Sequence, residues 1–407
     1  MICGFCKKKT KMILNLGKTP IANSFLTKKN INNKEKKFRL SLNYCNSCFL
    51  VQAPREVNSQ DIFNEEYIYF SSTSKSWSDH AKRYCKTILK KINLKKNSKI
   101  IEVASNDGYL LRNFDKKKFS LLGIEPSKNT AKKCEKDYKI PVIKDFLNLK
   151  LIKKKRLQNS ADLLIANNVL AHNPNIRNFV ESIKKILSAR GTATIEFPHF
   201  LNLYKELQFD TVYHEHFYYF TLKSLNIIFN YFKLTIWDVE ELKTHGGSLR
   251  LYISHESLKK KISKNVKRII NKEDKIGLFK PKTFLNFSKK VNIIKRNSLF
   301  FINQKIKNKK KIAVYGAAAK GNTFLNYLKL NNKKITTAFD LSKIKIGKYL
   351  PGSKIKVEFP YKKLLKNFDV IIILPWNLKK EITLQLKREI KKNCELFICI
   401  PKITKTN

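Results

Sequence analysis

Short apolar runs and longer amphipathic runs alternate through the middle of the chain, at the spacing expected of strands and helices. Each apolar run spans only about five residues and ends in small or polar residues, which is typical of strands buried in a parallel sheet. This alternation predicts a doubly wound parallel sheet, with a ligand at the carboxyl ends of its strands. The predicted strands lie at the start of 99–111 and at 121–124, 141–143, 161–165 and 192–197.

A second unit of the same kind follows a Lys-rich segment at 257–310, whose pattern predicts helices. The strand at 311–316 leads into a loop of small residues, where backbone N–H groups can approach a phosphate and Lys320 adds positive charge. The loop lacks the spacing of a dinucleotide site, so NAD is not expected. With strands at 335–339, 369–374 and 396–400, the pattern predicts a Rossmann-like domain that either contacts a ligand or serves only as scaffold.

The loop after the first predicted strand has the features of a nucleoside site. Compared with an acidic-x-Gly-x-Gly-x-Gly loop, it keeps Glu102 and one glycine while two other residues replace glycine. Without a Gly-rich pyrophosphate loop, S-adenosylmethionine fits better than a dinucleotide. Glu125 ends the next strand, where a carboxylate can accept hydrogen bonds from ribose hydroxyls or simply face solvent. The predicted cofactor-binding residues are Glu102, Ala104, Asn106, Asp107, Gly108, Glu125, Asp145, Phe146 and Asn167.

The charge of the chain is extreme. Its 407 residues include 84 Lys and Arg but only 31 Asp and Glu, a formal net charge of +53. This charge suits nucleic acid, an anionic membrane or a polyphosphorylated substrate. The abundance of Lys, Asn, Ile and Phe also fits A/T-rich codons, however, and the lysines are scattered. The longest apolar run, at 370–374, is far shorter than the ~20 residues of a membrane span, so we expect a cytoplasmic protein with no membrane and no nucleic-acid partner.

Four of the eight cysteines form two CxxC pairs near the N-terminus. Two such pairs complete a tetrahedral thiolate cage, which predicts a structural zinc ion in a ribbon of short strands. A redox-active CxxC is the alternative, although neither pair opens a recognisable helix that would lower a thiol pKa. The predicted zinc ligands are Cys3, Cys6, Cys45 and Cys48.

Histidines and tyrosines gather after the fourth and fifth predicted strands, at His172, His199 and the run from Tyr213 to His216. An imidazole beside a carboxylate and a phenol suits a general base with an orienting partner and an oxyanion stabiliser. His214 and His216 could instead chelate a metal, but no third ligand is near in sequence. The pattern favours proton-transfer chemistry.

Several motifs in one order resemble the S-adenosylmethionine-dependent sugar C-methyltransferases that act on nucleotide-linked deoxy-keto-sugars. They are the four cysteines, YIYFSS from Tyr67, EVASNDGYLL, GIEPS, NNVLAHNPN, IEFPH, YHEHFYYF, HGGSLR from His245 and GAAAKGNT from Gly316. The resemblance implies a class I methyltransferase Rossmann-like domain between a zinc-binding module and a C-terminal Rossmann-like domain. The implied boundaries are 1–75 for the zinc module, 76–256 for the cofactor domain, 257–310 for a helical linker and 311–407 for a nucleotide-sugar-binding domain.

The resemblance also implies roles for individual residues. His216 is similar to the general base, Glu215 would orient it, and Tyr213 and His172 would stabilise an enolate oxygen or hold the sugar. Tyr67 or Tyr69 would close over the site. The remaining residues implied for substrate binding are Ser71, Ser72, His199, His245, Gly246, Gly316, Lys320 and Asn322.

The expected partner is therefore a nucleotide-diphosphate-linked keto-sugar, methylated at a carbon next to its ketone, and the expected state is a monomer. Two other functions stay open. An RNA or tRNA methyltransferase would explain a zinc ribbon together with the positive charge. A non-catalytic nucleotide-sugar-binding protein would need neither the histidines nor Tyr213.

Overall fold

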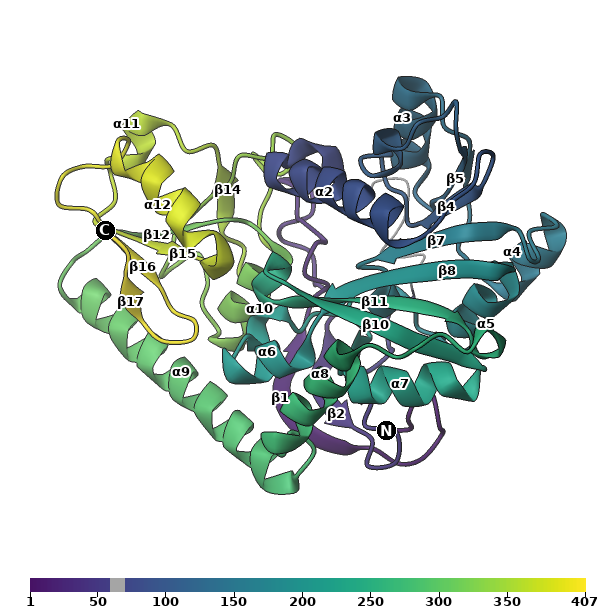
Figure 1. Ribbon diagram of the computed structural model, residues 1–407. Coiled ribbons are helices and arrows are strands. Elements are labelled where there is room, and N and C mark those ends of the chain that lie inside the picture. The colour runs from purple at the N-terminus through teal and green to yellow at the C-terminus, as the bar shows by residue number, and fades with distance from the viewer. Residues whose placement is uncertain (59–69) are drawn as a thin grey trace.

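The computed structural model describes residues 1–58 and 70–407, which form three sheets (Figure 1). The N-terminal sheet has four antiparallel strands in the order β1-β2-β3-β9. Its first two strands lie between the cysteine pairs and confirm the short strands predicted there, and its third strand follows the second pair. Their bounds are β1 (Lys11–Thr19), β2 (Phe38–Tyr44), β3 (Val51–Gln52) and β9 (Tyr218–Tyr219).

The central sheet has seven strands in the order β10-β11-β8-β7-β4-β5-β6. The five strands from β8 to β6 are parallel, which confirms the predicted doubly wound sheet, while β11 pairs antiparallel with β8 and β10 pairs antiparallel with β11, so that only β11 runs against the others. This is the topology of a class I methyltransferase. The bounds are β4 (Lys99–Val103), β5 (Ser120–Ile124), β6 (Val142–Ile143), β7 (Ala161–Asn167), β8 (Leu187–Pro198), β10 (Leu234–Leu242) and β11 (Ser248–His255).

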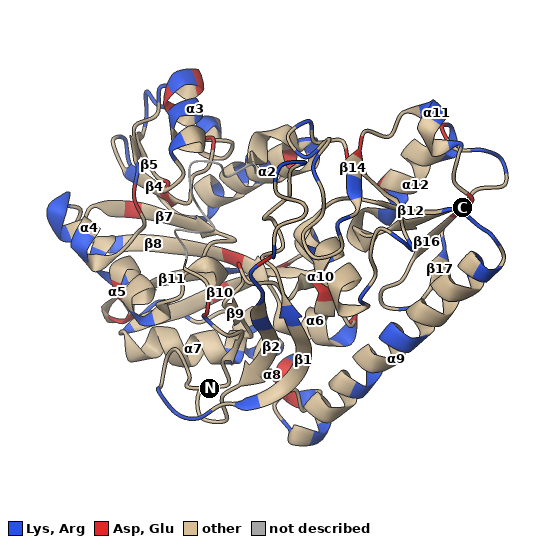
Figure 2. Ribbon diagram, turned by 180° about the vertical axis from the view of Figure 1, so that it is seen from behind, with Lys and Arg blue, Asp and Glu red and all other residues tan. Residues whose placement is uncertain are grey.

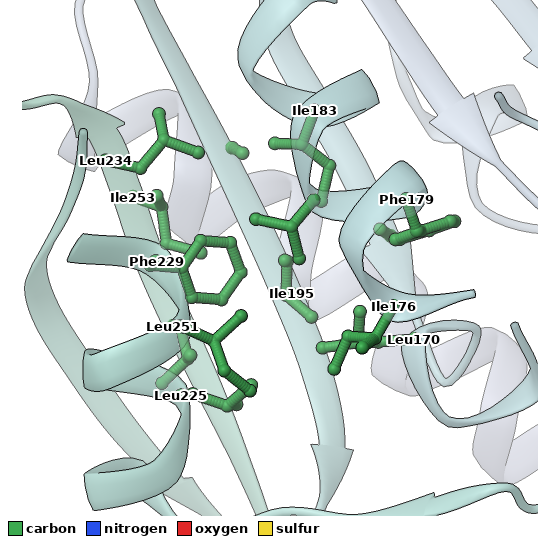
Figure 3. Close-up of a cluster of buried hydrophobic side chains, with 14 of the residues drawn as sticks. Leu170, Ile176, Phe179, Ile183, Ile195, Leu225, Phe229, Leu234, Leu251 and Ile253 are labelled. Carbon is green, nitrogen blue, oxygen red and sulfur yellow. The ribbon is translucent and has the colours of Figure 1, made fainter. Parts of the chain in front are cut away.

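Amphipathic helices cover the central sheet. In α5 (Ile176–Ile186), Ile176, Phe179 and Ile183 recur at helical spacing and are buried against the sheet (Figure 3). On the same face, Leu225 and Phe229 from α7 (Leu222–Tyr231) meet β11 and β10 (Figure 3). Each such side chain contributes about 1.5–3 kcal/mol when fully buried. The helices of this unit are α2 (Lys75–Lys91), α3 (Lys128–Tyr138), α4 (Leu149–Lys154), α5, α6 (Phe200–Lys205) and α7 (Leu222–Tyr231).

The C-terminal sheet has six strands in the order β14-β13-β12-β15-β16-β17, parallel except for β17. It confirms the predicted second Rossmann-like unit. Its strands are β12 (Ile312–Tyr315), β13 (Thr337–Phe339), β14 (Lys356–Glu358), β15 (Val370–Ile373), β16 (Glu395–Ile398) and β17 (Thr404–Lys405). Its helices are α10 (Ala319–Tyr327), α11 (Lys362–Leu365) and α12 (Lys379–Lys387).

Two helices, α8 (Lys264–Lys275) and α9 (Pro281–Lys307), connect the central and C-terminal sheets. Pro281 begins α9, where its missing N–H costs nothing. No helix within 1–58 and 70–407 is both long enough and apolar enough to cross a membrane. The short 3-10 helices are η1 (Ser71–Thr73), η2 (Leu111–Asn113), η3 (Leu170–His172), η4 (Phe209–Thr211), η5 (Thr244–Gly246), η6 (Glu256–Leu258) and η7 (Trp376–Leu378).

One strand joins two units that are far apart in sequence. β9 begins two residues after His216 and pairs with β3, so that Tyr218 lies opposite Gln52. Gln52 in turn accepts the backbone N–H of Gly4, inside the first cysteine pair, at 2.8 Å. The zinc-binding module therefore fixes the backbone that immediately follows His216.

Candidate active site and zinc centre

The four predicted zinc ligands converge. The sulfur atoms of Cys3, Cys6, Cys45 and Cys48 all lie within 4.8 Å of one another. The Sγ atoms of Cys3 and Cys48 are 3.5 Å apart, and those of Cys6 and Cys45 are 3.3 Å apart. Thiolates at Zn–S distances of about 2.3 Å around a tetrahedral ion have sulfur separations close to these values. A structural zinc ion therefore fits, and its four cysteine ligands leave no position for catalysis.

The loop after β4 has the backbone of a glycine-rich cradle with only one glycine. Ala104, Asn106 and Gly108 have φ angles of 55°, 50° and 78°, a region that side chains disfavour. A Cβ on Gly108 would lie 2.6 Å from the sulfur of Cys134, so glycine is required there. Asn tolerates this backbone better than most residues, which explains how Asn106 can replace a glycine.

Glu125 holds this loop in place. Its carboxylate accepts the backbone N–H of Asn106 and that of Ser127, each at 2.9 Å. Burial raises the pKa of Glu125, and these hydrogen bonds oppose the effect. Each carboxylate oxygen keeps a second lone pair that a ribose hydroxyl could use.

Unpartnered polar atoms mark the carboxyl edge of the central sheet. Within the described residues, Ser105 Oγ, Ser127 Oγ and Asn167 Oδ1 are buried without a hydrogen-bond partner. They follow or end β4, β5 and β7, three neighbouring strands. Because such atoms are costly to bury alone, this edge fits a polar ligand such as S-adenosylmethionine. By contrast, Asp145 is exposed and accepts the backbone N–H of Phe146.

Residues 71 and 72 lie over the cofactor loop. The backbone N–H of Ser71 donates to Asn106 Oδ1 at 2.9 Å, and the Ser72 hydroxyl donates to Asp107. Asp107 is fully buried. These contacts place both serines beside the residues expected to bind the cofactor. Tyr67 and Tyr69, the other residues expected in this segment, lie outside the described residues.

The tautomer of His216 follows from its two neighbours. Its Nδ1 lies 3.2 Å from the carbonyl oxygen of Thr211, which can only accept, so Nδ1 carries the proton. Nε2 is therefore the basic nitrogen, and it accepts the hydroxyl proton of Tyr213 at 2.9 Å. Burial, followed by the nearby His172, lowers the pKa of His216 well below its usual value. His216 is thus held as a neutral base whose lone pair meets the Tyr213 hydroxyl.

His172 lies against His216, with their ring centroids 4.8 Å apart. Its Nδ1 donates to the backbone carbonyl of Glu215 at 2.7 Å, and burial lowers its pKa to about 4. His172 Nε2 is consequently an acceptor, which suits a hydroxyl rather than an oxyanion. The Glu215 carboxyl accepts from Asn23 at 2.6 Å, and burial raises its pKa to about 7. The Glu215 carboxyl therefore bonds Asn23 and not His216, whose imidazole is oriented by the Thr211 carbonyl instead.

The C-terminal unit contributes a lysine and an indole to the same region. Lys320 Nζ donates to Asn377 at 2.7 Å and lies 4.6 Å from the centre of the Trp376 ring. Trp376 Nε1 donates to Asp210 at 2.8 Å, two residues before the segment from Val212 to His216. Burial raises the pKa of Asp210 to about 6, whereas Lys320 opposes this. Burial lowers the pKa of Lys320 itself.

The turn at His245 lies between the central helix α2 and the C-terminal unit. His245 has a φ of 52° and meets the edge of Trp77 with a centroid distance of 4.9 Å. Burial, followed by Lys320, lowers its pKa to about 4. A Cβ on Gly246 would lie 2.7 Å from both Gln208 and Trp376, so a larger residue would push the units apart.

Three residues expected to bind substrate make structural contacts instead. His199 Nε2 bonds Glu273 of α8 at 2.7 Å. Asn322 donates to the carbonyl of Ala22 at 3.3 Å, and the N–H of Gly316 donates to the carbonyl of Phe339 at 2.7 Å.

His214, one of the two histidines of the metal alternative, packs its ring against Phe38. Within 1–58 and 70–407, only the four cysteines form a cluster able to hold a metal, so the alternative of a metal at His214 and His216 has no third ligand.

Sequence reasoning missed several residues of the site. Asp210 and Trp376 pair across two units, and His80 lies in a buried network with Glu196 and Arg250. Trp77 stacks on His80 at a centroid distance of 5.0 Å. The bond between Asp210 and Trp376 spans 166 positions and that between His80 and Arg250 spans 170, so no local pattern indicates them. The rarity of tryptophan, with three in the chain, was the available signal.

Known proteins resemble the chain along nearly its whole length. Three family models match in order: a zinc binding domain at residues 3–63, a methyltransferase domain at 77–239 and a C-methyltransferase C-terminal domain at 243–401. The C-methyltransferase NovU of Streptomyces niveus is 26% identical over 391 residues, covering 96% of this chain and 93% of that protein.

Solved structures resemble it less closely. The magnesium protoporphyrin IX methyltransferase of Synechocystis, solved with bound S-adenosylmethionine, is 11% identical with a TM-score of 0.34, covering 44% of this chain and 79% of its own. The CurJ carbon methyltransferase is 11% identical with a TM-score of 0.37, covering 49% and 62%. At these TM-scores the similarity is weak. Together with the full-length relative, the three matched domains show that the chain is an S-adenosylmethionine-dependent C-methyltransferase with an N-terminal zinc-binding domain.

Proposed function

We propose that the enzyme methylates a carbon next to the ketone of a nucleotide-diphosphate-linked deoxy-keto-sugar, at carbon 3 of a 4-keto-sugar. The observation that supports this most strongly is the pair of His216 and Tyr213, a buried neutral imidazole whose basic nitrogen meets a phenol. A ketone acidifies the neighbouring C–H bond enough for such a base. The motif resemblance to sugar C-methyltransferases supports the choice of substrate.

His216 removes the proton in this mechanism. The C–H electron pair moves toward the ketone, leaving an enolate, while the proton goes to Nε2 of His216. The Thr211 carbonyl, which accepts from Nδ1, stabilises the imidazolium that forms. Ser105, Ser127 and Asn167 would hold S-adenosylmethionine, which would supply the electrophilic methyl group and leave as S-adenosylhomocysteine when the carbon–sulfur bond breaks. The enolate carbon takes this methyl, and the ketone re-forms.

Tyr213 stabilises the enolate oxygen. Its hydroxyl donates to His216 in the absence of substrate and can donate to the ketone oxygen once the sugar is present. When the Tyr213 hydroxyl bonds the ketone oxygen instead of His216, the Nε2 lone pair of His216 is exposed to the C–H bond. His172, whose Nε2 is an acceptor, holds a sugar hydroxyl. Phenol donors of this kind contribute about 10²–10³ in rate.

Lys320 and Trp376 hold the diphosphate end of the substrate. The ammonium group of Lys320 is half-buried near His245 and Asp210, where burial strengthens its attraction for an anion. Trp376 offers a ring beside that charge. Since both come from the C-terminal unit, that unit contributes to sugar binding across the interface.

The test is to incubate the zinc-loaded enzyme with methyl-labelled S-adenosylmethionine and a panel of nucleotide-linked 4-keto-sugars, beside bulk tRNA. We expect label on carbon in a keto-sugar product and none in tRNA. His216→Asn should abolish transfer and leave cofactor binding nearly unchanged, with Lys289→Gln on the far surface of α9 as a control. Label confined to tRNA would refute the proposal in favour of an RNA methyltransferase.

A further inference from the structure

A groove lies where the zinc-binding module meets the C-terminal unit. It encloses about 490 Å³ between β1, α9 and the last turn of α10, and both helices pack against β1. Lys320 stands in the first turn of α10, at the other end of the helix, so this groove is separate from the active site. We call it the lysine groove after four of its lining residues, Lys18, Lys37, Lys295 and Lys329.

The four lysines of the groove have no acidic partner. Within the described residues, no carboxylate lies within 4.0 Å of any of their ammonium groups. Other lysines of this protein are paired, such as Lys391 with Asp369 at 2.8 Å and Lys91 with Asp238 at 2.5 Å. The segment 275–339, which supplies α9 and α10, contains no Asp or Glu at all. Within this segment, therefore, no acidic residue offsets the positive charge.

Lys295 lies close to a second lysine of the groove and to an aromatic ring. Its Nζ lies 4.2 Å from the centre of the Tyr327 ring, and the Tyr327 hydroxyl donates to Asn292 of α9 at 2.8 Å. Burial, followed by repulsion from Lys329, lowers the pKa of Lys295. Two ammonium groups brought together without an anion between them raise the free energy of the unliganded protein. A bound anion would remove that cost.

The walls of the groove are fixed by local structure. Gly352 has a φ of 77°, and a Cβ there would lie 1.9 Å from Oδ1 of Asn326, so no other residue fits. Asn326 donates to the carbonyl of Pro351 at 3.1 Å. Glu35 approaches this rim, but its carboxylate accepts the N–H of Gly352 at 2.9 Å and 3.0 Å. The groove is thus shaped in advance, and the nearby carboxylate of Glu35 is held at its rim by the N–H of Gly352.

We propose that the lysine groove binds a phosphate-bearing ligand of nucleotide size. Ammonium groups are compact point charges with three donors each, which suits several phosphate oxygens better than a single carboxylate. The volume lies within the range of small-molecule sites, about 300–1,000 Å³. Asn15 and Asn331 add amide groups to the lining, able to bond a sugar or base. Lysines are scattered along the whole chain (Figure 2), but in this groove four of them line one concavity whose lining contains no acidic residue.

The experiment titrates inorganic tripolyphosphate into the full-length, zinc-loaded protein by calorimetry. The double variant Lys295→Gln/Lys329→Gln should bind at least tenfold more weakly. The matched control is Lys282→Gln/Lys289→Gln, which removes the same charge from exposed positions of α9 and should change affinity less than twofold. Unchanged cofactor binding and thermal unfolding would show that both variants fold.

Equal weakening in both double variants would overturn the proposal, because it would indicate only the diffuse field of the protein. Loss of binding in Lys320→Gln, with the groove variant unaffected, would overturn it as well, since the probe would then occupy the active site. A second arm uses a ten-residue oligouridylate. If the groove binds the oligonucleotide more tightly than tripolyphosphate, the ligand phosphates are those of RNA. If it binds tripolyphosphate more tightly, the ligand is a small phosphorylated molecule.

Discussion

The two Rossmann-like units use the same device at their first loop, with different results. In the central unit, Glu125 at the end of the second strand accepts the N–H of Asn106. In the C-terminal unit, Asp340 stands at the matching position and accepts the N–H of Ala317 at 2.8 Å. Both acids order a loop that leads from a parallel strand into a helix.

The surroundings of the two loops differ. Near the central loop, Ser105 and Ser127 keep buried hydroxyls without partners in the described structure. At the C-terminal loop, Lys345 donates to the carbonyl of Ala317 at 3.0 Å, and Pro375 lies where a Cβ on Gly316 would be, at 2.4 Å. The central edge therefore offers polar atoms to a ligand, whereas the second loop is closed by its own residues. The central unit therefore serves the cofactor, whereas the C-terminal unit contributes side chains at the interface between the two units.

Zinc removal should produce the largest effect and confine it to the central unit. Chelation removes the free energy of metal binding, about 10 kcal/mol or more, that stabilises the folded module. Because β3 of that module pairs with β9, the backbone after His216 should lose its support. We expect turnover to fall about 10³-fold while cofactor affinity changes only a few-fold. The measurement is kcat and cofactor Kd after chelation, then after zinc is restored.

A Cys45→Ser variant gives the matched genetic control. If chelated enzyme kept normal turnover, the zinc-binding module would not support the catalytic loop. If cofactor binding were lost to the same degree, the module would support the whole central unit rather than that loop.

The buried carboxyl of Glu215 should make the stability of the central unit depend on pH. Burial raises its pKa from 4.5 to about 7 in the folded protein. Between these values the folded state binds more protons than the unfolded state, so stability falls as pH rises through that window. Because glutamine does not titrate, Glu215→Gln should reduce this fall in the free energy of unfolding by about 3 kcal/mol.

Denaturant unfolding at pH 5 and pH 8 measures this difference. Glu56→Gln serves as the control, because hydrogen bonds from Arg39 lower the pKa of Glu56, so that this carboxyl titrates below the measured range and its replacement should leave the difference between pH 5 and pH 8 unchanged. An identical pH dependence in wild type and Glu215→Gln would show that the Glu215 carboxyl is not buried as described.

Paired substitutions at the two loop acids break or sharpen the comparison itself. Glu125→Ala should weaken S-adenosylmethionine binding about 30-fold, since each lost hydrogen bond to a charged group costs about 1.5–3 kcal/mol. Asp340→Ala, which removes the same bond from the second loop, should leave that affinity within twofold. Equal losses of cofactor affinity would contradict the assignment of a single cofactor site.

The smallest effect is expected at the interface between the units. Trp376→Phe keeps the ring beside Lys320 but removes the N–H that donates to Asp210. We expect the KM for the keto-sugar to rise about fivefold with kcat nearly unchanged, about 1 kcal/mol. Steady-state kinetics measure this split. A fall in kcat alone would place Trp376 in the chemical step instead.

Local patterns predicted the parts of the molecule that depend on local sequence. Strands ending at Val103 and Ile124, and the two CxxC pairs, follow from apolar runs and fixed spacing. The predicted orienting role of Glu215 placed it beside His216, whereas its side chain bonds Asn23 across 192 positions. The pairing of β9 with β3 and of Trp376 with Asp210 likewise joins distant segments, which no periodicity encodes.

Proton exchange at the substrate carbon tests the central claim, that His216 generates an enolate, most directly. The zinc-loaded enzyme is incubated with a nucleotide-linked 4-keto-sugar in D₂O without S-adenosylmethionine, and proton spectra follow the C–H next to the ketone. Wild-type enzyme should exchange this proton for deuterium, and His216→Asn should show only the background rate of buffer. Exchange at the same rate in both proteins would contradict the assignment of His216 as the base.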